Sequence, residues 1–279
     1  MLRRPTEEAV KKDMALVYKL TLDPSRSGYP VYTDGIKTRA DFEGALWKGF
    51  SEGNQELLLF EKNGMASGWI QFFFIPEEKY LQTVMFSISE DTQAALEEFT
   101  AYCAEKYPGY TLYLGFPGEN RQALAWLEGH NWEQAEKCWN NVLRLENYEI
   151  QQEVGDIRPV SKENFADFRC LHSWYEADMY WNSERLYQAL DQWDIWLYYE
   201  NDSPVGAVYY QNGEIMGVDF REGIFRETVF HSLLVKVMNH CKKQGTGHIV
   251  FFHEGAGQAT VLDAGFTCVG EYVLYIKTV

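Results

Sequence analysis

Apolar and polar positions in the first half of the chain predict helices and strands in a fixed order. Apolar residues recur at helical spacing between Thr38 and Phe50. The run Leu57–Lys62 ends at Asn63-Gly64, a pair typical of a hairpin turn, and Gly68–Phe74 returns as the next strand. The other elements expected in this half are a helix over Thr6–Leu20, a strand over Leu81–Ile88, a helix over Asp91–Lys106, a strand over Thr111–Gly115, a short helix over Asn120–Leu127 and closing strands that include Trp139–Leu145.

The second half repeats this order. A helix over Lys162–Leu171 precedes two apolar runs, Ile195–Glu200 and Val205–Tyr210, and a second Asn-Gly pair follows at Asn212-Gly213. The elements expected after this turn are a strand over Glu214–Phe220, a helix over Arg226–Gln244 that Gly245 stops, a strand over His248–Phe252, a short helix over Gly255–Asp263 and a last strand over Tyr272–Lys277.

This repetition predicts two domains with the same fold. The period of roughly 135 residues is far too long for a solenoid and indicates a duplication. We expect one domain over residues 1–150 and another over residues 151–279, with the polar segment Asn147–Asp156 as the hinge. Each is expected to be an α/β (α+β) unit in which helices flank a mixed, mostly antiparallel, twisted sheet.

The charge of the chain restricts its partners. The net charge is −16 and the sequence pI is about 4.8. Nucleic acids and anionic membrane surfaces are therefore not expected as partners, because binding them requires clustered Lys and Arg. A small cationic amine would be attracted, although the charge is explained more simply by a role in solubility alone.

Cysteine usage and the N-terminus suggest a compartment. The five cysteines are scattered and form no close-spaced metal motif, so no metal site is expected, and they are typical of reduced thiols in a cytoplasmic protein. The first residues contain no apolar core of a signal peptide, and no run approaches 18 apolar residues. We therefore expect a cytoplasmic protein without a membrane span.

A short motif follows the strand over Thr111–Gly115 in the first half and the strand over His248–Phe252 in the second. Residues 119–132 read ENRQALAWLEGHNW, and residues 254–266 read EGAGQATVLDAGF. They resemble the stretch Asn-x-x-Ala-x-x-x-Tyr-x-x-x-Gly-Phe of the GCN5-related N-acetyltransferases. Asn120 and Ala123 match in the first half and Gly265-Phe266 matches in the second. Leu127 and Val261 stand where the family has Tyr. Because the motif recurs at the same place, the resemblance extends over nearly the whole chain.

The resemblance implies a reaction and a site for it. Members of this family transfer an acetyl group from acetyl-CoA to a primary amine. The pantetheine arm fills the gap where the fourth strand diverges from the fifth, and a backbone N–H of the fourth strand polarises the thioester carbonyl. The pyrophosphate binds a Gln/Arg-x-x-Gly-x-Gly/Ala loop at a helix N-terminus.

The first half departs from this phosphate loop. After its meander the chain reads Ser89-Glu90-Asp91-Thr92-Gln93, with two carboxylates and no glycine. These carboxylates suit the helix N-terminus themselves and repel a phosphate. We therefore expect no CoA site in the first half.

The second half allows two interpretations. Arg226 falls at the Gln/Arg position, whereas Val229 and His231 stand where the two glycines belong. The segment is either a divergent but working CoA site or a vestigial helix start. For the working site, the expected cofactor contacts are Val218, Phe220, Arg221, Arg226, Val229, Phe230 and His231.

Candidate acid or base groups lie at the ends of the strands over Glu214–Phe220 and His248–Phe252, where we expect them to face a cleft between these strands. Asp219 ends the one, and His253 and Glu254 follow the other, where ligand-contacting residues often lie. These three are the catalytic candidates, against the alternative that each is structural.

The aromatic and acidic stretch His172–Trp181 lies in the region that shapes the acceptor pocket of the family. Carboxylates among rings suit an ammonium group through charge and cation–π contacts. The alternative is a packed surface between helices. The expected substrate contacts are Trp174, Tyr175, Glu176, Asp178 and Tyr180.

Two functions follow from these patterns. The first is an N-acetyltransferase with acetyl-CoA as donor, a small amine as acceptor, no metal, and its active site in the second domain. The second is a catalytically inactive binding or interaction module with the same fold and a decayed CoA site.

Overall fold

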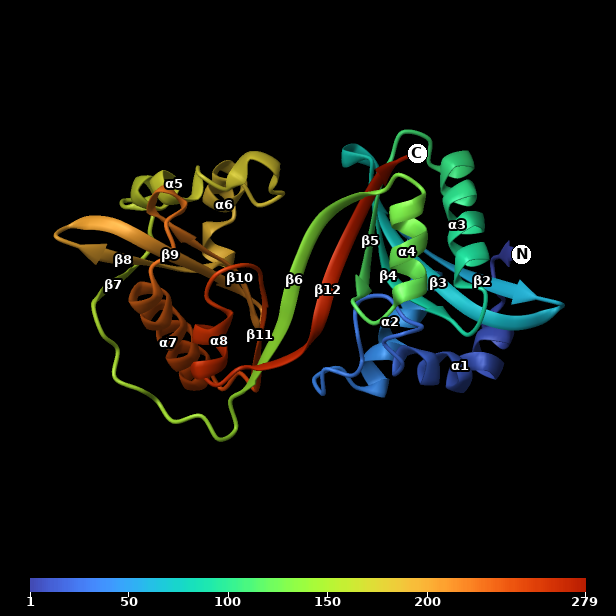
Figure 1. The fold of residues 1–279 in the computed structure, drawn as a ribbon, viewed down its shortest axis with the longest axis horizontal. Helices are drawn as coiled ribbons and strands as arrows, with labels where there is room; N and C mark the ends of the chain where they lie inside the picture. Colours follow the sequence, from blue (N-terminus) through green and yellow to red (C-terminus); the bar gives the residue numbers. More distant parts are fainter. The chain divides into compact units, whose positions relative to one another are not determined.

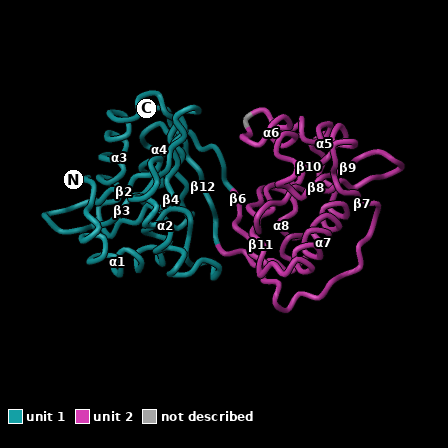
Figure 2. The backbone as a smooth tube through the Cα atoms, turned by 180° about the vertical axis from the view of Figure 1, so that it is seen from behind, with its two compact units in different colours: residues 1–137, 270–279 teal, residues 138–269 magenta. Residues whose placement is uncertain are grey.

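The chain folds into two compact units in a computed structural model that describes residues 1–177 and 179–279. Unit 1 comprises Met1–Lys137 and Gly270–Val279, and unit 2 comprises Cys138–Val269 (Figure 2). The structure thus divides the chain elsewhere than at residue 150. The reason is that the closing strand of each repeat pairs with the other repeat's fifth strand.

Unit 1 contains a six-stranded sheet in the order β1-β2-β3-β4-β5-β12 (Figure 1). Only β4 and β5 pair in parallel among these strands. The elements are β1 (Leu2–Arg3), α1 (Glu7–Thr21), α2 (Arg39–Ser51), β2 (Gln55–Lys62), β3 (Met65–Ile75), β4 (Tyr80–Ile88), α3 (Thr92–Lys106), β5 (Thr111–Pro117), α4 (Arg121–Gly129) and the end of β12 (Thr267–Thr278).

Unit 2 repeats this topology in the order β6-β11-β10-β9-β8-β7. Here the parallel pair is β10 and β11. The elements are the end of β6 (Glu133–Arg144), β7 (Asp156–Pro159), α5 (Phe165–His172), α6 (Ser183–Gln188), β8 (Asp194–Glu200), β9 (Ser203–Gln211), β10 (Glu214–Phe220), the 3-10 turn η4 (Arg221–Gly223), α7 (Glu227–Gln244), β11 (His248–His253) and α8 (Gln258–Asp263).

The closing strands are exchanged between the repeats. In unit 1, Tyr272–Thr278 of β12 pair antiparallel with Pro117–Thr111 of β5. In unit 2, Trp139–Arg144 of β6 pair antiparallel with His253–His248 of β11. β12, from the second repeat, therefore completes the sheet of unit 1, and β6, from the first repeat, completes the sheet of unit 2.

Local sequence explains why the elements form. Asn63 and Gly64 both adopt positive φ, 52° and 75°, as the tight turn between β2 and β3 requires. The side chain of Thr38 accepts the Asp41 N–H, and Asp41 returns a bond to the Thr38 N–H, which completes a capping box at the start of α2.

Helices cover both faces of each sheet. In unit 1, Leu57 and Leu59 pack with the residues of α1 and α2, whereas Leu58 and Phe60 pack with those of α3 and α4. This alternation is the period of two expected of a strand buried on both faces. In unit 2 the corresponding layers are α5 and α6 on one face and α7 and α8 on the other.

The predicted fold class is confirmed: helices flank a mixed, mostly antiparallel sheet. The predicted helices over residues 91–106 and 226–244 are α3 and α7, each one residue shorter at its start. The short edge strands β1 and β7 were not predicted. No helix in the described ranges is long and apolar enough to cross a membrane.

Candidate functional site

In both units the fourth strand diverges from the fifth. β4 pairs with β5 only at Tyr80–Gln82, and β10 pairs with β11 only at Glu214 and Ile215. Beyond these residues the ends of β4 and β10 have no fifth-strand partner. This divergence is the feature that the family resemblance associates with the pantetheine arm.

The gap in unit 1 is filled by the chain itself. The Ile88 N–H of β4 donates to the Arg26 carbonyl at 3.0 Å, and the Gly28 N–H donates to the Phe86 carbonyl of the same strand at 2.6 Å. The next residue, Tyr29, donates its N–H to the Gly115 carbonyl of β5 at 2.9 Å. We call residues 26–29 the plug, because they join both diverging strands through backbone hydrogen bonds.

The plug fits this gap closely. A Cβ on Gly28 would lie 3.0 Å from the Gly115 carbonyl oxygen and 3.1 Å from Cβ of Phe86. Ser27 is 1% exposed, and its carbonyl accepts a hydrogen bond of 3.1 Å from the side-chain amide of Asn120. Asn120 also caps α4, since its Oδ1 accepts the Ala123 N–H at 3.2 Å. The motif asparagine of this repeat therefore holds the plug.

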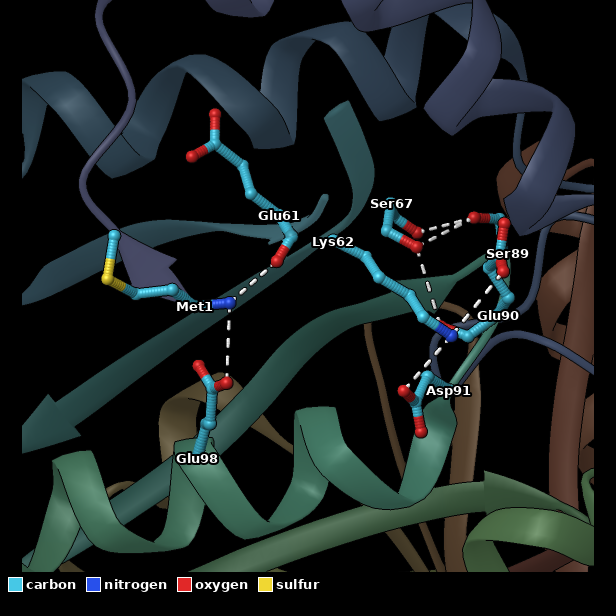
Figure 3. A network of polar contacts seen from close by, with 8 residues as sticks. All are labelled: Met1, Glu61, Lys62, Ser67, Ser89, Glu90, Asp91 and Glu98. Carbon is cyan, nitrogen blue, oxygen red and sulfur yellow. Dashed lines mark hydrogen bonds and ion pairs between the residues drawn. The ribbon is translucent and has the colours of Figure 1, made fainter. Parts of the chain in front are cut away.

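The loop before α3 carries its own ionic partner. The ammonium group of Lys62 lies 3.1 Å from Asp91 and 3.6 Å from Glu90 (Figure 3). The hydrogen bond to Asp91 raises the pKa of Lys62. Ser89 donates both its N–H and its hydroxyl to the Ser67 carbonyl, at 2.7 and 2.8 Å. Hydrogen bonds to Ser67 thus tie the loop to β3, and Lys62 of β2 pairs with its carboxylates.

The corresponding loop of unit 2 runs from Arg221 to Arg226. Within it Glu222 and Gly223 adopt positive φ, 57° and 68°. Arg226 precedes α7 without a side-chain cap, and its guanidinium lies 2.8 Å from Glu200. Both side chains of this ion pair are a little over one-third exposed, so the pair is accessible to solvent.

The structure places the residues aligned with the family glycines inside α7. The helix begins at Glu227, so Val229 and His231 belong to its first turns. Val229 is 1% exposed and packs toward Gly206 of β9, Phe230 is fully buried, and His231 is exposed. The side chains of Val229 and Phe230 are thus buried in the core, and the Phe230 N–H already donates to the Arg226 carbonyl, so the side chains of these two expected cofactor contacts do not face a ligand.

The remaining expected cofactor contacts lie at the end of β10. Val218 is half-buried and packs against the core beside α7, and Phe220 is buried in the same core. Arg221 is half-buried at the start of the loop. Only backbone groups of Val218 and Phe220 are therefore placed to contact a ligand from this strand.

Asp219 is committed to a buried partner. It is 2% exposed, and its Oδ2 lies 2.7 Å from Nδ1 of His172, which is fully buried at the end of α5. Nε2 of His172 donates to the Trp181 carbonyl at 2.9 Å. Because a carbonyl only accepts, Nε2 carries a proton, and a further proton is shared between His172 and Asp219.

The environment of this pair holds the shared proton. Burial raises the pKa of Asp219, as expected for a carboxyl group removed from water. Burial alone lowers the pKa of His172, but the hydrogen bond and the charge of Asp219 outweigh it and raise that pKa. The expectation that Asp219 faces a cleft is therefore wrong, since its carboxyl group is enclosed by protein.

His253 and Glu254 lie apart from that pair in the contacts described for unit 2. His253 Nε2 donates to the Ala256 carbonyl at 3.1 Å, and its ring packs on Phe230 and Phe251. Burial lowers the pKa of His253, so its imidazole is neutral at neutral pH. Glu254 is exposed. The catalytic candidates thus form no single constellation.

The aromatic stretch after α5 is divided in its roles. Trp174 and Tyr180 are 61% and 47% exposed, whereas the Tyr175 hydroxyl contacts the backbone of Phe220. Glu176 accepts the Ser183 N–H at 2.6 Å. The predicted contact Asp178 lies outside the described residues. A cavity of about 440 Å³ opens here. It is lined by Arg169, Glu176, Asn182, Ser183 and Glu184.

Sequence reasoning missed His172, although the acidic and aromatic stretch begins at this residue. Its partner is 47 residues away, and no spacing rule joins them. Within the described ranges, no group of three or more His, Cys, Asp or Glu side chains could hold a metal ion.

Comparison with known proteins supports the fold. No protein-family profile and no curated protein matches the chain. A GCN5-related N-acetyltransferase from Sphaerobacter thermophilus has a TM-score of 0.65 at 14% identity, covering 99% of this chain and 95% of that one. A putative acetyltransferase from Pyrococcus horikoshii gives 0.53 at 12% identity, covering 100% and 89%.

A third solved structure is a tandem protein. It is described as a tandem GNAT protein from the clavulanic acid biosynthesis pathway, and it gives a TM-score of 0.52 at 12% identity, covering 99% of this chain and 98% of that one. At these identities the comparisons show the fold alone. They confirm that this chain has the tandem fold of the GCN5-related N-acetyltransferases, as the repeated motif indicated.

Proposed function

We propose that this protein is an N-acetyltransferase that uses acetyl-CoA and a small amine, with one cofactor site, in unit 2. The observation that carries this proposal is the plug. In unit 1 the gap between the fourth and fifth strands is filled by residues 26–29. Among the described residues of unit 2, no segment of that unit makes backbone hydrogen bonds to both β10 and β11 beyond Ile215.

The residues of unit 2 fit a CoA thioester and its pyrophosphate. The N–H of Phe220 at the end of β10 can donate a hydrogen bond to the thioester carbonyl. Arg221, Arg226 and the first amides of the 18-residue helix α7 can receive the phosphates. Gly223 lets the loop backbone turn with positive φ before the helix. The corresponding loop of unit 1 presents Glu90 and Asp91 instead.

The cavity after α5 suits a cationic acceptor. Glu176 and Glu184 line it together with one cation, Arg169, so the lining is net acidic, and the net charge of −16 attracts an ammonium group over longer distances. Acetyl-CoA supplies the activated acetyl group, and the amine must lose a proton before it attacks. His253 is the remaining candidate base, because its imidazole is neutral at neutral pH. Its Nε2 donates to the Ala256 carbonyl, so Nδ1 is the unprotonated nitrogen that can accept a proton. Glu254 beside it is exposed to solvent.

The alternative of an inactive binding module has its own support. Glu222 and Glu227 flank the loop before α7, and Glu200 engages Arg226. Each of these carboxylates opposes a bound phosphate. The two glycines of the family loop are also missing, because Val229 and His231 stand at their positions. The cytoplasmic location and the absence of nucleic-acid and membrane partners remain predictions.

Titration calorimetry with acetyl-CoA tests the proposal. We expect one acetyl-CoA per chain, and we expect Arg226→Glu to weaken binding by about tenfold or more, because it replaces an attraction to phosphate by a repulsion. The matched control is Arg39→Glu on α2, which leaves binding unchanged. Absence of binding at millimolar acetyl-CoA would instead support the inactive module.

A further inference from the structure

Tyr175 occupies the backbone position that the proposed thioester site requires. The Phe220 N–H donates to the Tyr175 hydroxyl at 3.2 Å, and that hydroxyl donates to the Phe220 carbonyl at 3.3 Å. One phenol thus satisfies both backbone groups of a single strand residue. It acts at this point as a neighbouring strand does in a sheet.

The topology explains why this amide is open to a side chain. In a strand, the N–H and C=O of one residue point to the same side. Phe220 is aligned with Gly206 of β9, but its N–H goes to Tyr175, so its backbone groups face away from β9. That is the side from which β11 has diverged after Phe251. The Phe220 amide therefore points into the gap between β10 and β11.

Tyr175 is held over the gap from both directions along the chain. Its own N–H donates to the His172 carbonyl at 2.9 Å, and His172 is anchored to Asp219. Beyond it, Glu176 accepts the Ser183 N–H. A Cβ on Gly223 would lie 3.9 Å from the Tyr175 hydroxyl, so this hydroxyl also borders the loop before α7.

A thioester carbonyl can replace the phenol oxygen at the Phe220 N–H. Burial raises the pKa of Tyr175, so the hydroxyl is neutral and both donates and accepts. A thioester carbonyl only accepts. It can replace the phenol oxygen at the Phe220 N–H, but not the phenol's donation to the Phe220 carbonyl. The Phe220 N–H exchanges one hydrogen bond for another, whereas the Phe220 carbonyl loses its donor when the ring moves, so the exchange costs affinity.

We propose that Tyr175 is a displaceable gate, whose hydroxyl satisfies the Phe220 amide in the free protein and yields it to the thioester carbonyl of acetyl-CoA. This inference rests on the function proposed above. Tyr175 is then a positioning residue that lowers the affinity for acetyl-CoA, because the cofactor must displace an existing hydrogen bond. Free CoA has no thioester carbonyl and does not compete for the Phe220 amide.

The test compares acetyl-CoA and CoA binding to wild-type protein and Tyr175→Phe by calorimetry. Tyr175→Phe removes the competing hydroxyl and leaves the Phe220 N–H unsatisfied. We expect acetyl-CoA to bind about 2- to 10-fold more tightly and CoA affinity to change by less than about twofold. Tyr187→Phe on α6, whose ring packs 5.0 Å from Phe165, is the control and changes neither affinity.

Two outcomes overturn the gate. Equal changes for acetyl-CoA and CoA, or weaker acetyl-CoA binding by Tyr175→Phe, contradict it. Hydrogen exchange of the Phe220 amide gives a second measurement that needs no ligand, and we expect this exchange to be faster in Tyr175→Phe than in wild type. If the Phe220 amide exchanges faster in Tyr175→Phe but acetyl-CoA does not bind to either protein, the proposed function is wrong and the Tyr175 contact is still supported. Unchanged exchange sinks the gate by itself.

Discussion

The two units share one topology and differ in what lies where their fourth and fifth strands part. In unit 1 the plug joins β4 to β5 through the backbone. In unit 2 a single hydroxyl, that of Tyr175, meets the end of β10. Strand divergence has therefore been retained in both copies, although in unit 1 the chain itself supplies the hydrogen bonds.

The loops that follow the diverging strands differ in the same sense. Unit 1 places two carboxylates before α3 and pairs both with one cation, Lys62, so one negative charge remains (Figure 3). Unit 2 places two arginines around a loop that contains Gly223. Each loop thus has an internal ion pair, but the loop of unit 1 is net acidic whereas that of unit 2 carries Arg221 and Arg226 beside Glu222 and Glu227. The comparison teaches that the fold alone does not identify which copy holds a cofactor.

The largest expected effect concerns the buried pair of unit 2. Asp219→Ala leaves His172 buried without its partner, and we expect it to lower the free energy of unfolding by about 3–5 kcal/mol. The measurement is equilibrium denaturation in urea at pH 6. A loss below about 1 kcal/mol would mean that the pair is dispensable.

The same pair predicts a pH dependence. The folded pKa of His172 lies above the ordinary 6.5, so its stabilising contribution is complete below pH 6.5 and is lost as the pH rises through the folded value. Glu176, which also faces His172, supports the charged form. Asp219→Ala should flatten this decline in denaturation experiments above pH 6.5. An equal decline in both proteins would assign it to other groups.

A smaller effect is expected in unit 1 at Asn120. Asn120→Ala removes the cap of α4 and leaves the buried Ser27 carbonyl without its donor. We expect a loss of about 2–4 kcal/mol in denaturation experiments. The control is Asn182→Ala, which removes only the cap of α6 and should cost about 0.5–2 kcal/mol. Equal losses would show that Asn120 does not support the plug.

The smallest effect concerns Gly28 within the plug. Gly28→Ala places a Cβ 3.0 Å from the Gly115 carbonyl oxygen, so the plug must shift. We expect a destabilisation of about 1–2 kcal/mol. Gly44→Ala on α2 meets no neighbouring atom within 4 Å and should instead stabilise the protein by about 0.5–1 kcal/mol, measured in the same way. A stabilising Gly28→Ala would show that the plug is loosely held.

Most of the fold could be predicted because local patterns determine it. The Asn-Gly turns and the continuous apolar run Leu57–Phe60 each identify an element without tertiary information. The exchange of closing strands could not be predicted, because the alternating apolar residues of Trp139–Leu145 suit an edge of either sheet. The partner of such a strand is decided by packing, which leaves no local signal.

The candidate site was less predictable for a related reason. Residues 26–29 read as a loop between Pro24 and Pro30, because backbone hydrogen bonds leave no trace in side-chain identity. Asp219 was found as a strand-end carboxylate, but its pairing with His172 depends on how α5 packs on β10. Counting from the family motif placed Val229 and His231 at the glycine positions, but it could not show that Val229 is buried against β9 while His231 is exposed.

Hydrogen exchange with and without acetyl-CoA, measured peptide by peptide, tests the central claim that only unit 2 takes the cofactor. We predict that saturating acetyl-CoA slows exchange over residues 214–231, at the end of β10, the loop and the start of α7. Exchange over residues 26–29 and 80–92 of unit 1 should stay unchanged. The account would be contradicted if acetyl-CoA slowed exchange over those unit 1 segments and left exchange over residues 214–231 unchanged.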